Sequence, residues 1–164
     1  MRRFIECCAE VEELAAFIYR ELEVRADDNE PLQRLMRKLA DDEDDHARQL
    51  RFALRVSPKE TFAGINEAAG DPYQLKSEAE QLLNQVKAGT RNEHELLKIA
   101  VTLENRFQGI HAGYVLLFKD DSLKKLFSSL ARADEKHLVD LNAYLNEYKQ
   151  RRATSQSPRK GSCP

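Results

Sequence analysis

The pair Glu43 and His46 is the feature that most constrains how this chain can fold. It lies in a run from 31 to 55 whose apolar residues recur every three or four positions, as on the buried side of a bundle helix. Those apolar residues are Leu32, Met36, Leu39, Leu50 and Ala53. The same spacing, continued between Leu39 and Leu50, reaches Glu43 and His46, so both polar side chains are predicted to be buried. A buried carboxylate is costly unless it is paired or binds a metal.

An acid followed three residues later by a histidine is one half of a dinuclear metal site, when a second helix supplies the other half. A second such pair, Asp134 and His137, lies in the predicted helix 122–150. Its apolar companions at the same spacing are Leu123, Phe127, Leu130, Leu141, Tyr144 and Tyr148. The sequence therefore contains both halves.

Two further predicted helices each place one acid on an otherwise apolar face. Glu12 lies in the run 3–24, and Glu104 lies in the run 91–118. The companions of Glu12 are Ile5, Cys8, Ala15, Tyr19 and Leu22, and those of Glu104 are Leu97, Ala100, Phe107, His111, Tyr114 and Phe118. A single acid on an apolar face can be a packing compromise. This explanation becomes weaker when such an acid occurs in every long helix.

The four runs form a repeat of two hairpins. Glu12 precedes His46 by 34 residues, and Glu104 precedes His137 by 33 residues. Two similar hairpins joined by a long connection predict an all-α four-helix bundle with pseudo-twofold symmetry. The connection is predicted to be irregular over 56–73, followed by a short extra helix between the second and third long helices.

The extra helix is predicted at 75–88, where Gly89 ends it. Its apolar positions are Leu75, Ala79, Leu82, Leu83 and Val86. The predicted helix N-caps are Asn29, Thr90 with Glu93 as a capping box, and Asp120 or Asp121.

Charge is unevenly distributed along the 164 residues, which are enough for one domain. We expect a bundle over 1–150 and a disordered basic tail over 151–164. The tail carries Arg151, Arg152, Arg159 and Lys160 and no acid, which leaves 22 basic residues against 28 acidic ones in the rest of the chain. An acidic body argues against nucleic acid as a partner and is compatible with attracting cations.

The three cysteines are Cys7, Cys8 and Cys163, and no Cys-x-x-Cys pair occurs. This spacing excludes a disulfide framework and a four-cysteine metal site. No apolar signal segment and no run of 18 apolar residues is present, so we expect a cytoplasmic protein without a membrane partner.

The polar residues on the apolar faces suggest a pair of iron ions, with manganese as the other possibility. They are Glu12, Glu43, His46, Glu104, Asp134 and His137. Four carboxylates neutralise the four charges of two divalent ions and can bridge them, and each histidine adds one neutral nitrogen. Oxygen and imidazole ligands without cysteine suit iron or manganese better than structural zinc. The alternative is a metal-free core of ion pairs.

The chain resembles the ferritin-like superfamily, and most closely its rubrerythrin-like branch, over about residues 3–150. The resemblance is carried by Glu12 with Tyr19, Glu43-x-x-His46, Glu104 and Asp134-x-x-His137. It implies a ferritin-like bundle with a carboxylate-bridged di-iron centre. One ion would bind Glu12, Glu43 and His46. The other would bind Glu104, Asp134 and His137.

Three departures from the family pattern matter. The sequence lacks the four cysteines of a rubredoxin domain, the electron donor of full rubrerythrins. Phe107 stands where rubrerythrins carry an extra glutamate, which argues against a redox-driven exchange of ligands and so against peroxidase activity. Asp134 replaces the usual glutamate and is one methylene shorter, so its metal is expected to bind more weakly.

Tyr19 and His111 each follow a predicted ligand by seven residues. Tyr19 is the catalytic candidate, because it can donate an electron or hydrogen-bond a ligand carboxylate across the bundle, although it can equally be a plain core tyrosine. His111 can play the matching part, act as an additional ligand, or be a satisfied core histidine.

The function implied by the resemblance is oxidation of ferrous iron by dioxygen or peroxide, in a homo-oligomer that we expect to be a dimer. One alternative is a metal-binding or interaction module without turnover, which oxygen uptake on addition of ferrous iron would distinguish. Another is an oxygenase for an organic substrate, which would need an apolar pocket beside the metals.

Overall fold

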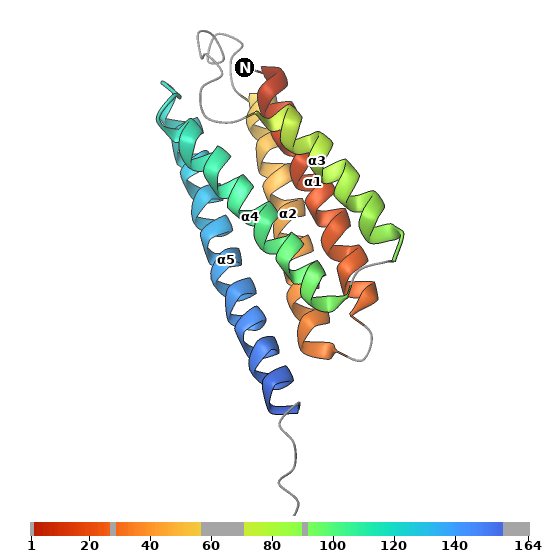
Figure 1. Cartoon of the computed structure of the whole chain (residues 1–164). Helices are drawn as coiled ribbons and strands as arrows, with labels where there is room; N and C mark the ends of the chain where they lie inside the picture. The colour runs from red at the N-terminus through yellow and green to blue at the C-terminus, as the bar shows by residue number, and fades with distance from the viewer. Residues whose placement is uncertain (1, 27–28, 57–70, 90–91, 156–164) are drawn as a thin grey trace, which may run out of the picture.

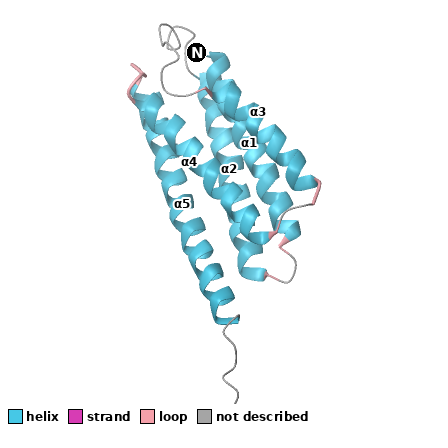
Figure 2. Ribbon diagram, in the orientation of Figure 1, coloured by secondary structure: helices cyan, strands magenta, loops and turns pink. Residues whose placement is uncertain are grey.

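The structure is a computed structural model that describes residues 2–26, 29–56, 71–89 and 92–155. The described residues form helices and no strand (Figure 2). The helices are α1 (Arg2–Arg25), α2 (Glu30–Val56), α3 (Pro72–Lys87), α4 (Glu93–Val115) and α5 (Asp121–Ser155). None of them is both long and apolar enough to span a membrane. The prediction of an all-α protein is confirmed.

The four long helices pair as two hairpins (Figure 1). Helix α1 packs along α2, and α4 packs along α5. The hairpins meet where α2 contacts α5 and α1 contacts α4. The short helix α3 lies outside this bundle, against α1, as expected for an extra element in the connection. Most of the connection that we predicted to be irregular, 57–70, lies outside the described residues.

The predicted apolar faces form the core. All their members in the four long helices are buried, except Tyr148, which packs against the core while partly exposed. Fully burying a leucine or phenylalanine contributes about 1.5–3 kcal/mol, so these faces provide the main stabilisation. Helix α1 also buries residues beside its predicted face, such as Cys7 and Val11, in keeping with the packing of α3 against it.

Aromatic side chains close the core at one end of the bundle. The rings of Phe4 and Tyr114 pack in a tilted contact with centroids 3.9 Å apart, and the ring centroids of Phe118 and Phe127 lie 4.7 Å apart. These contacts join α1, the end of α4 and the start of α5. They fix the two hairpins against each other on one side of the polar residues at mid-length.

The observed caps agree with the predictions at two helices and correct one. Asn29 accepts a hydrogen bond from the backbone of Leu32, and Asp120 accepts one from Leu123. The capping box of α4 is formed by Asn92 and Glu95, so the prediction of Thr90 with Glu93 is wrong. The helix begins at Glu93, which makes the preceding asparagine its cap. Thr90 itself lies outside the described residues.

Helix ends differ from the sequence prediction by three residues or more at three places. Helix α3 begins at Pro72 and not at 75, with Asp71 as its N-cap, so the last residues of the connection that we predicted to be irregular are helical. Helix α4 ends at Val115 and not at 118, because the backbone N–H groups of Leu117 and Phe118 both bond to the carbonyl of Tyr114 in a closing turn. Helix α5 continues past Gln150 to Ser155, so the first residues of the predicted tail are helical. Residues 156–164 lie outside the described part of the chain.

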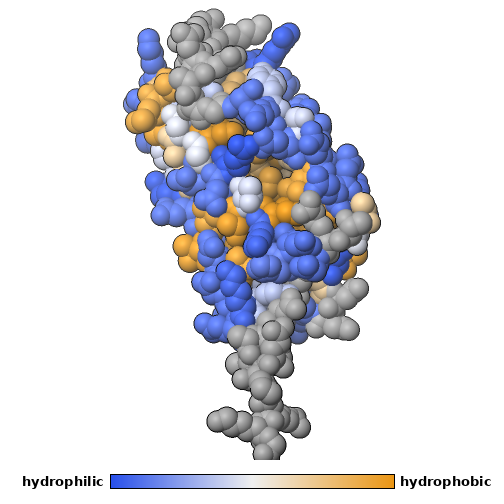
Figure 3. Space-filling view, in the orientation of Figure 1, coloured by the Kyte–Doolittle hydropathy of each residue, from blue (hydrophilic) through white to orange (hydrophobic). Residues whose placement is uncertain are grey.

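A groove of about 310 Å³ separates α3 from α4. Its apolar lining residues are Leu75, Leu82, Ile99 and Leu103. Arg106 and Glu78 form an ion pair between the two helices that border it. Figure 3 shows apolar atoms in the middle of this face, flanked by polar ones.

Candidate metal centre

A layer of buried polar side chains crosses the bundle at mid-length. Its members are Glu12 from α1, Glu43 and His46 from α2, Glu104 and His111 from α4, and Asp134 and His137 from α5. None is more than 6% exposed. Each ligand candidate that helical periodicity predicted to be buried is buried, and so is His111.

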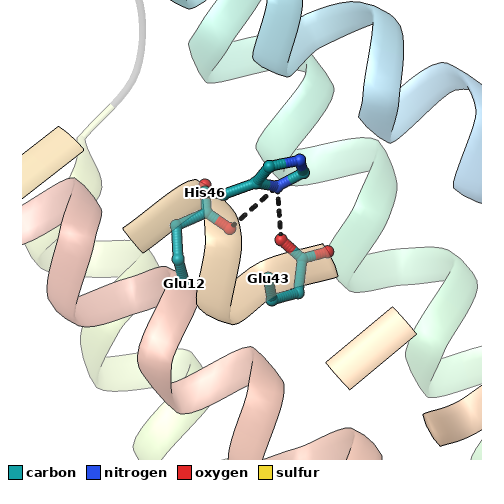
Figure 4. A group of neighbouring side chains, drawn as sticks. All are labelled: Glu12, Glu43 and His46. Carbon is teal, nitrogen blue, oxygen red and sulfur yellow. Dashed lines mark hydrogen bonds and ion pairs between the residues drawn. The ribbon is translucent and has the colours of Figure 1, made fainter. Parts of the chain in front are cut away.

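The first group of possible ligands lies within the N-terminal hairpin. Glu12, Glu43 and His46 each offer one ligand atom, and the three atoms lie within 4.8 Å of one another. The Nδ1 atom of His46 is 2.8 Å from Glu43 Oε2 and 3.9 Å from Glu12 Oε2. Figure 4 shows the two carboxylates and the imidazole converging from α1 and α2. These are the residues predicted for the first ion.

The second group draws on both hairpins. It consists of Glu43, Glu104 and His137, again with one atom from each within 4.8 Å. His137 Nδ1 is 3.2 Å from Glu43 Oε1 and 3.3 Å from Glu104 Oε2. Glu43 therefore belongs to both groups and directs one oxygen toward each histidine. A carboxylate in that place is suited to bridging two ions.

Asp134, which we predicted to share an ion with Glu104 and His137, belongs to neither of these two groups. Its Oδ2 atom is 2.8 Å from His111 Nδ1, and its Oδ1 atom is buried with no hydrogen-bond partner in the described part of the chain. The other ring nitrogen of His111, Nε2, is 3.1 Å from Glu12 Oε1. The imidazole of His111 therefore lies between two carboxylates from two other helices.

Tyr19 makes the hydrogen bond across the bundle that its position suggested. Its hydroxyl donates to Glu104 Oε1 at 2.6 Å. Tyr19 follows Glu12 by seven residues and contacts Glu104, whereas His111 follows Glu104 by seven and contacts Glu12. Each hairpin thus supplies a side chain that holds the lone glutamate of the other.

Asp42 is a residue of the centre that sequence reasoning missed. Its Oδ2 atom is 3.1 Å from His137 Nε2, on the side of the ring that faces away from Glu43. A carboxylate on the outer nitrogen fixes the tautomer and leaves Nδ1 for a metal. The repeat could not reveal this contact, because the residue equivalent to Asp42 before Asp134 is Ala133.

The histidines of the metal-free centre are basic. Burial alone would lower the pKa of His46, but the nearby carboxylates of Glu12 and Glu43 outweigh burial and raise the pKa to about 11. The pKa of His137 is likewise raised to about 10, against the effect of burial, by Glu104 and Glu43. Both imidazoles are therefore expected to carry a proton at neutral pH when no metal is bound.

The glutamates diverge in their acidity. Burial raises the pKa of Glu104 to about 7, and the nearby charge of Glu43 adds to the rise. Burial would also raise the pKa of Glu12, but the nearby imidazoles of His111 and His46 outweigh it and bring the pKa down to about 2. One carboxyl of the layer is thus partly protonated at neutral pH while another is fully ionised.

The donor atoms of the layer fit a pair of divalent cations. Two buried carboxylate oxygens of the two groups, Glu12 Oε2 and Glu43 Oε1, have no hydrogen-bond partner among the described residues. A buried acceptor left unsatisfied costs about 1–3 kcal/mol, and a cation would satisfy it. Carboxylate oxygens and imidazole nitrogens without thiolates suit iron or manganese.

The fold and the buried layer together define a helical-bundle protein of the ferritin-like type, with glutamate and histidine groups that could hold metal. The Rubrerythrin family matches residues 4–144, a span that includes every residue of the layer. The chain therefore belongs to the rubrerythrin family. No curated protein and no solved structure matches it.

Proposed function

We propose that this protein binds two iron ions, for which manganese can substitute, and oxidises ferrous iron with dioxygen or peroxide. The supporting observation is the shared carboxylate of Glu43. One position is formed by Glu12, Glu43 and His46, and the other by Glu43, Glu104 and His137. A common carboxylate holds two ions near each other, roughly 3.5–4 Å apart in two-metal sites.

The chain's own residues supply charge, orientation and exclusion of water. The glutamates would offset the positive charge of the ions, which is required because an unpaired charge is costly in a buried site. Tyr19 holds Glu104 by one oxygen, which leaves Oε2 facing His137. Asp42 holds His137 from outside. The bound iron supplies the electron transfer.

Tyr19 is the proposed catalytic side chain. Its phenol is fully buried and donates a hydrogen bond to the carboxylate of Glu104, so it would lie beside an ion held by Glu104. Burial raises its pKa well above the usual value, and the charges of Glu104 and Glu43 raise it further. The hydroxyl therefore stays protonated and can act as a hydrogen-bond donor or lose an electron and a proton together.

Two observations favour ferrous iron as the substrate. Phe107 is buried one turn after Glu104 and offers no ligand there, so the extra glutamate of the peroxidase pattern has no substitute at this position. The lining of the apolar groove between α3 and α4 includes none of the buried acids or histidines, so it does not provide a substrate pocket for an oxygenase.

The test is to load the protein with ferrous iron without oxygen and then add dioxygen. We expect about two ions to bind per chain and oxygen to be consumed faster than in buffer with the same iron. At saturating iron, Tyr19→Phe should still fill both positions and should slow the oxidation. Binding of two ions with no extra oxygen uptake would instead support the metal-binding module, and absence of binding would refute the proposal.

A second prediction concerns the contact of Asp42 with His137. Asp42→Ala should weaken manganese binding at the position that contains His137 by about 10–100-fold, as expected when the outer partner of a ligand histidine is lost. The matched control is Asp45→Ala, on the same helix, whose ion pair is with Arg48. Calorimetric titration should show the loss in the first variant alone. Equal affinities in both would remove Asp42 from the centre.

A further inference from the structure

We propose that Asp134 and His111 form a positioning pair that orients Glu12, and that Asp134 is not itself a metal ligand. This inference rests on the proposed metal centre. It concerns how one glutamate of that centre is held. It assigns a role to both residues through contacts that cross three helices.

The contacts run in one line from α5 to α1. Asp134 Oδ2 lies 2.8 Å from Nδ1 of His111, and Nε2 of the same ring lies 3.1 Å from Glu12 Oε1. The edge-to-face contact of His111 with Phe127, with centroids 5.6 Å apart and planes at 78°, supports the ring on one side. All three polar residues are at most 2% exposed, so water does not compete for these contacts.

The pair determines which oxygen of Glu12 faces the ions. His111 engages Oε1. Oε2 is then left without a hydrogen-bond partner, 3.9 Å from Nδ1 of His46. A carboxylate held by one oxygen presents the other in a fixed direction, and such outer contacts raise the affinity of a site for metal.

The two hairpins show why Asp134 differs from its counterpart Glu43. In the N-terminal half, Tyr19 holds Glu104 with its single hydroxyl, and Glu43 is left to reach both ligand histidines. In the C-terminal half, the place of tyrosine is taken by His111, whose second nitrogen engages Asp134. The C-terminal hairpin therefore differs from the N-terminal one at two residues that contact each other: Asp134 replaces a glutamate, and His111 replaces a tyrosine.

A double-mutant cycle measured by anaerobic titration with manganous ion tests the pair. Asp134→Ala and His111→Phe should each weaken the Glu12 position about tenfold, and the double variant should also lose about tenfold, because both changes remove the same support. Asp134→Asn keeps an acceptor for the ring and should restore most of the affinity. Circular dichroism should show unchanged helix content.

The matched control is Tyr19→Phe, which removes the equivalent support from Glu104. When Tyr19→Phe is combined with Asp134→Ala, the two losses of manganese affinity should multiply, because the two variants act on different metal positions. If the double variant of Asp134 and His111 loses about a hundredfold in manganese affinity, or if Asp134→Asn binds one ion fewer, Asp134 is a ligand. Either result would overturn this inference and leave the proposed metal centre standing. Wild-type protein that binds no manganese would overturn the proposed centre as well.

Discussion

Replacing Glu43 with glutamine is expected to abolish metal binding at both positions, the largest effect of any single change in the chain. One carboxylate oxygen of Glu43 faces His46 in the first group of possible ligands, and the other faces His137 in the second group. Glutamine keeps the size of the side chain but removes the negative charge and one acceptor, so neither ion retains a bridging ligand. Anaerobic titration with ferrous or manganous ion measures the loss.

Two controls separate this result from misfolding. Glu12→Gln and Glu104→Gln each change one group alone and should each lose one ion while keeping the other. The metal-free Glu43→Gln protein should keep the helix content of metal-free wild type by circular dichroism but melt lower, because the change removes the carboxylate that pairs with His46 at 2.8 Å and with His137 at 3.2 Å. Two ions bound with unchanged affinity in Glu43→Gln would contradict the shared carboxylate.

Saturation with manganese is expected to raise the melting temperature by about 10–20 °C. Each ion at about 100 times its dissociation constant adds about 2.7 kcal/mol, and about 1 kcal/mol corresponds to about 2–4 °C for a chain of this size. Thermal unfolding with and without manganese measures the shift. Coincident melting curves would mean that the buried layer does not bind metal.

The same experiment has a defined pH dependence. The pKa values of His46 and His137 are raised from 6.5 to about 11 and about 10, and that of Glu104 is raised from 4.5 to about 7. Without metal, the stability contributed by these protons is complete below the unfolded pKa values and is lost as the pH rises through the folded ones. The metal-free protein should therefore melt lower at about pH 9 than at about pH 6.

Metal reverses this trend, because an ion must displace the protons of the ligand histidines. The difference between the melting temperatures with and without manganese should consequently grow from about pH 6 to about pH 9. A difference that shrinks over this range would show that His46 and His137 do not bind the ion.

Helical periodicity predicted the fold and the burial of the ligand candidates because both depend on which face of a helix is covered. Glu43 and Glu104 lie at the expected positions and are fully buried. The hydrogen bond of Tyr19 to a carboxylate across the bundle is one of the roles that the sequence left open for this residue, beside that of a plain core tyrosine. Periodicity places a residue on a face, and a four-helix bundle brings the faces together.

Contacts within the buried layer could not be predicted from the sequence in the same way, because they depend on side-chain length and on the rotation of neighbouring helices. Asp42 lies beside the predicted face and is partly exposed, yet its carboxylate reaches His137 on α5. Asp134 lies on the face but contacts His111. No spacing rule reports which of two nearby partners a side chain will choose.

The distribution of the two groups over the hairpins bears on the order in which the protein acquires its ions. Glu12, Glu43 and His46 all come from α1 and α2, whose mutual contacts are close in sequence, and such local structure forms early in folding. The other group also needs Glu104 and His137 from the second hairpin. A chain still emerging from the ribosome would therefore have one complete group once α2 has formed, whereas the second would have to wait for synthesis of α5.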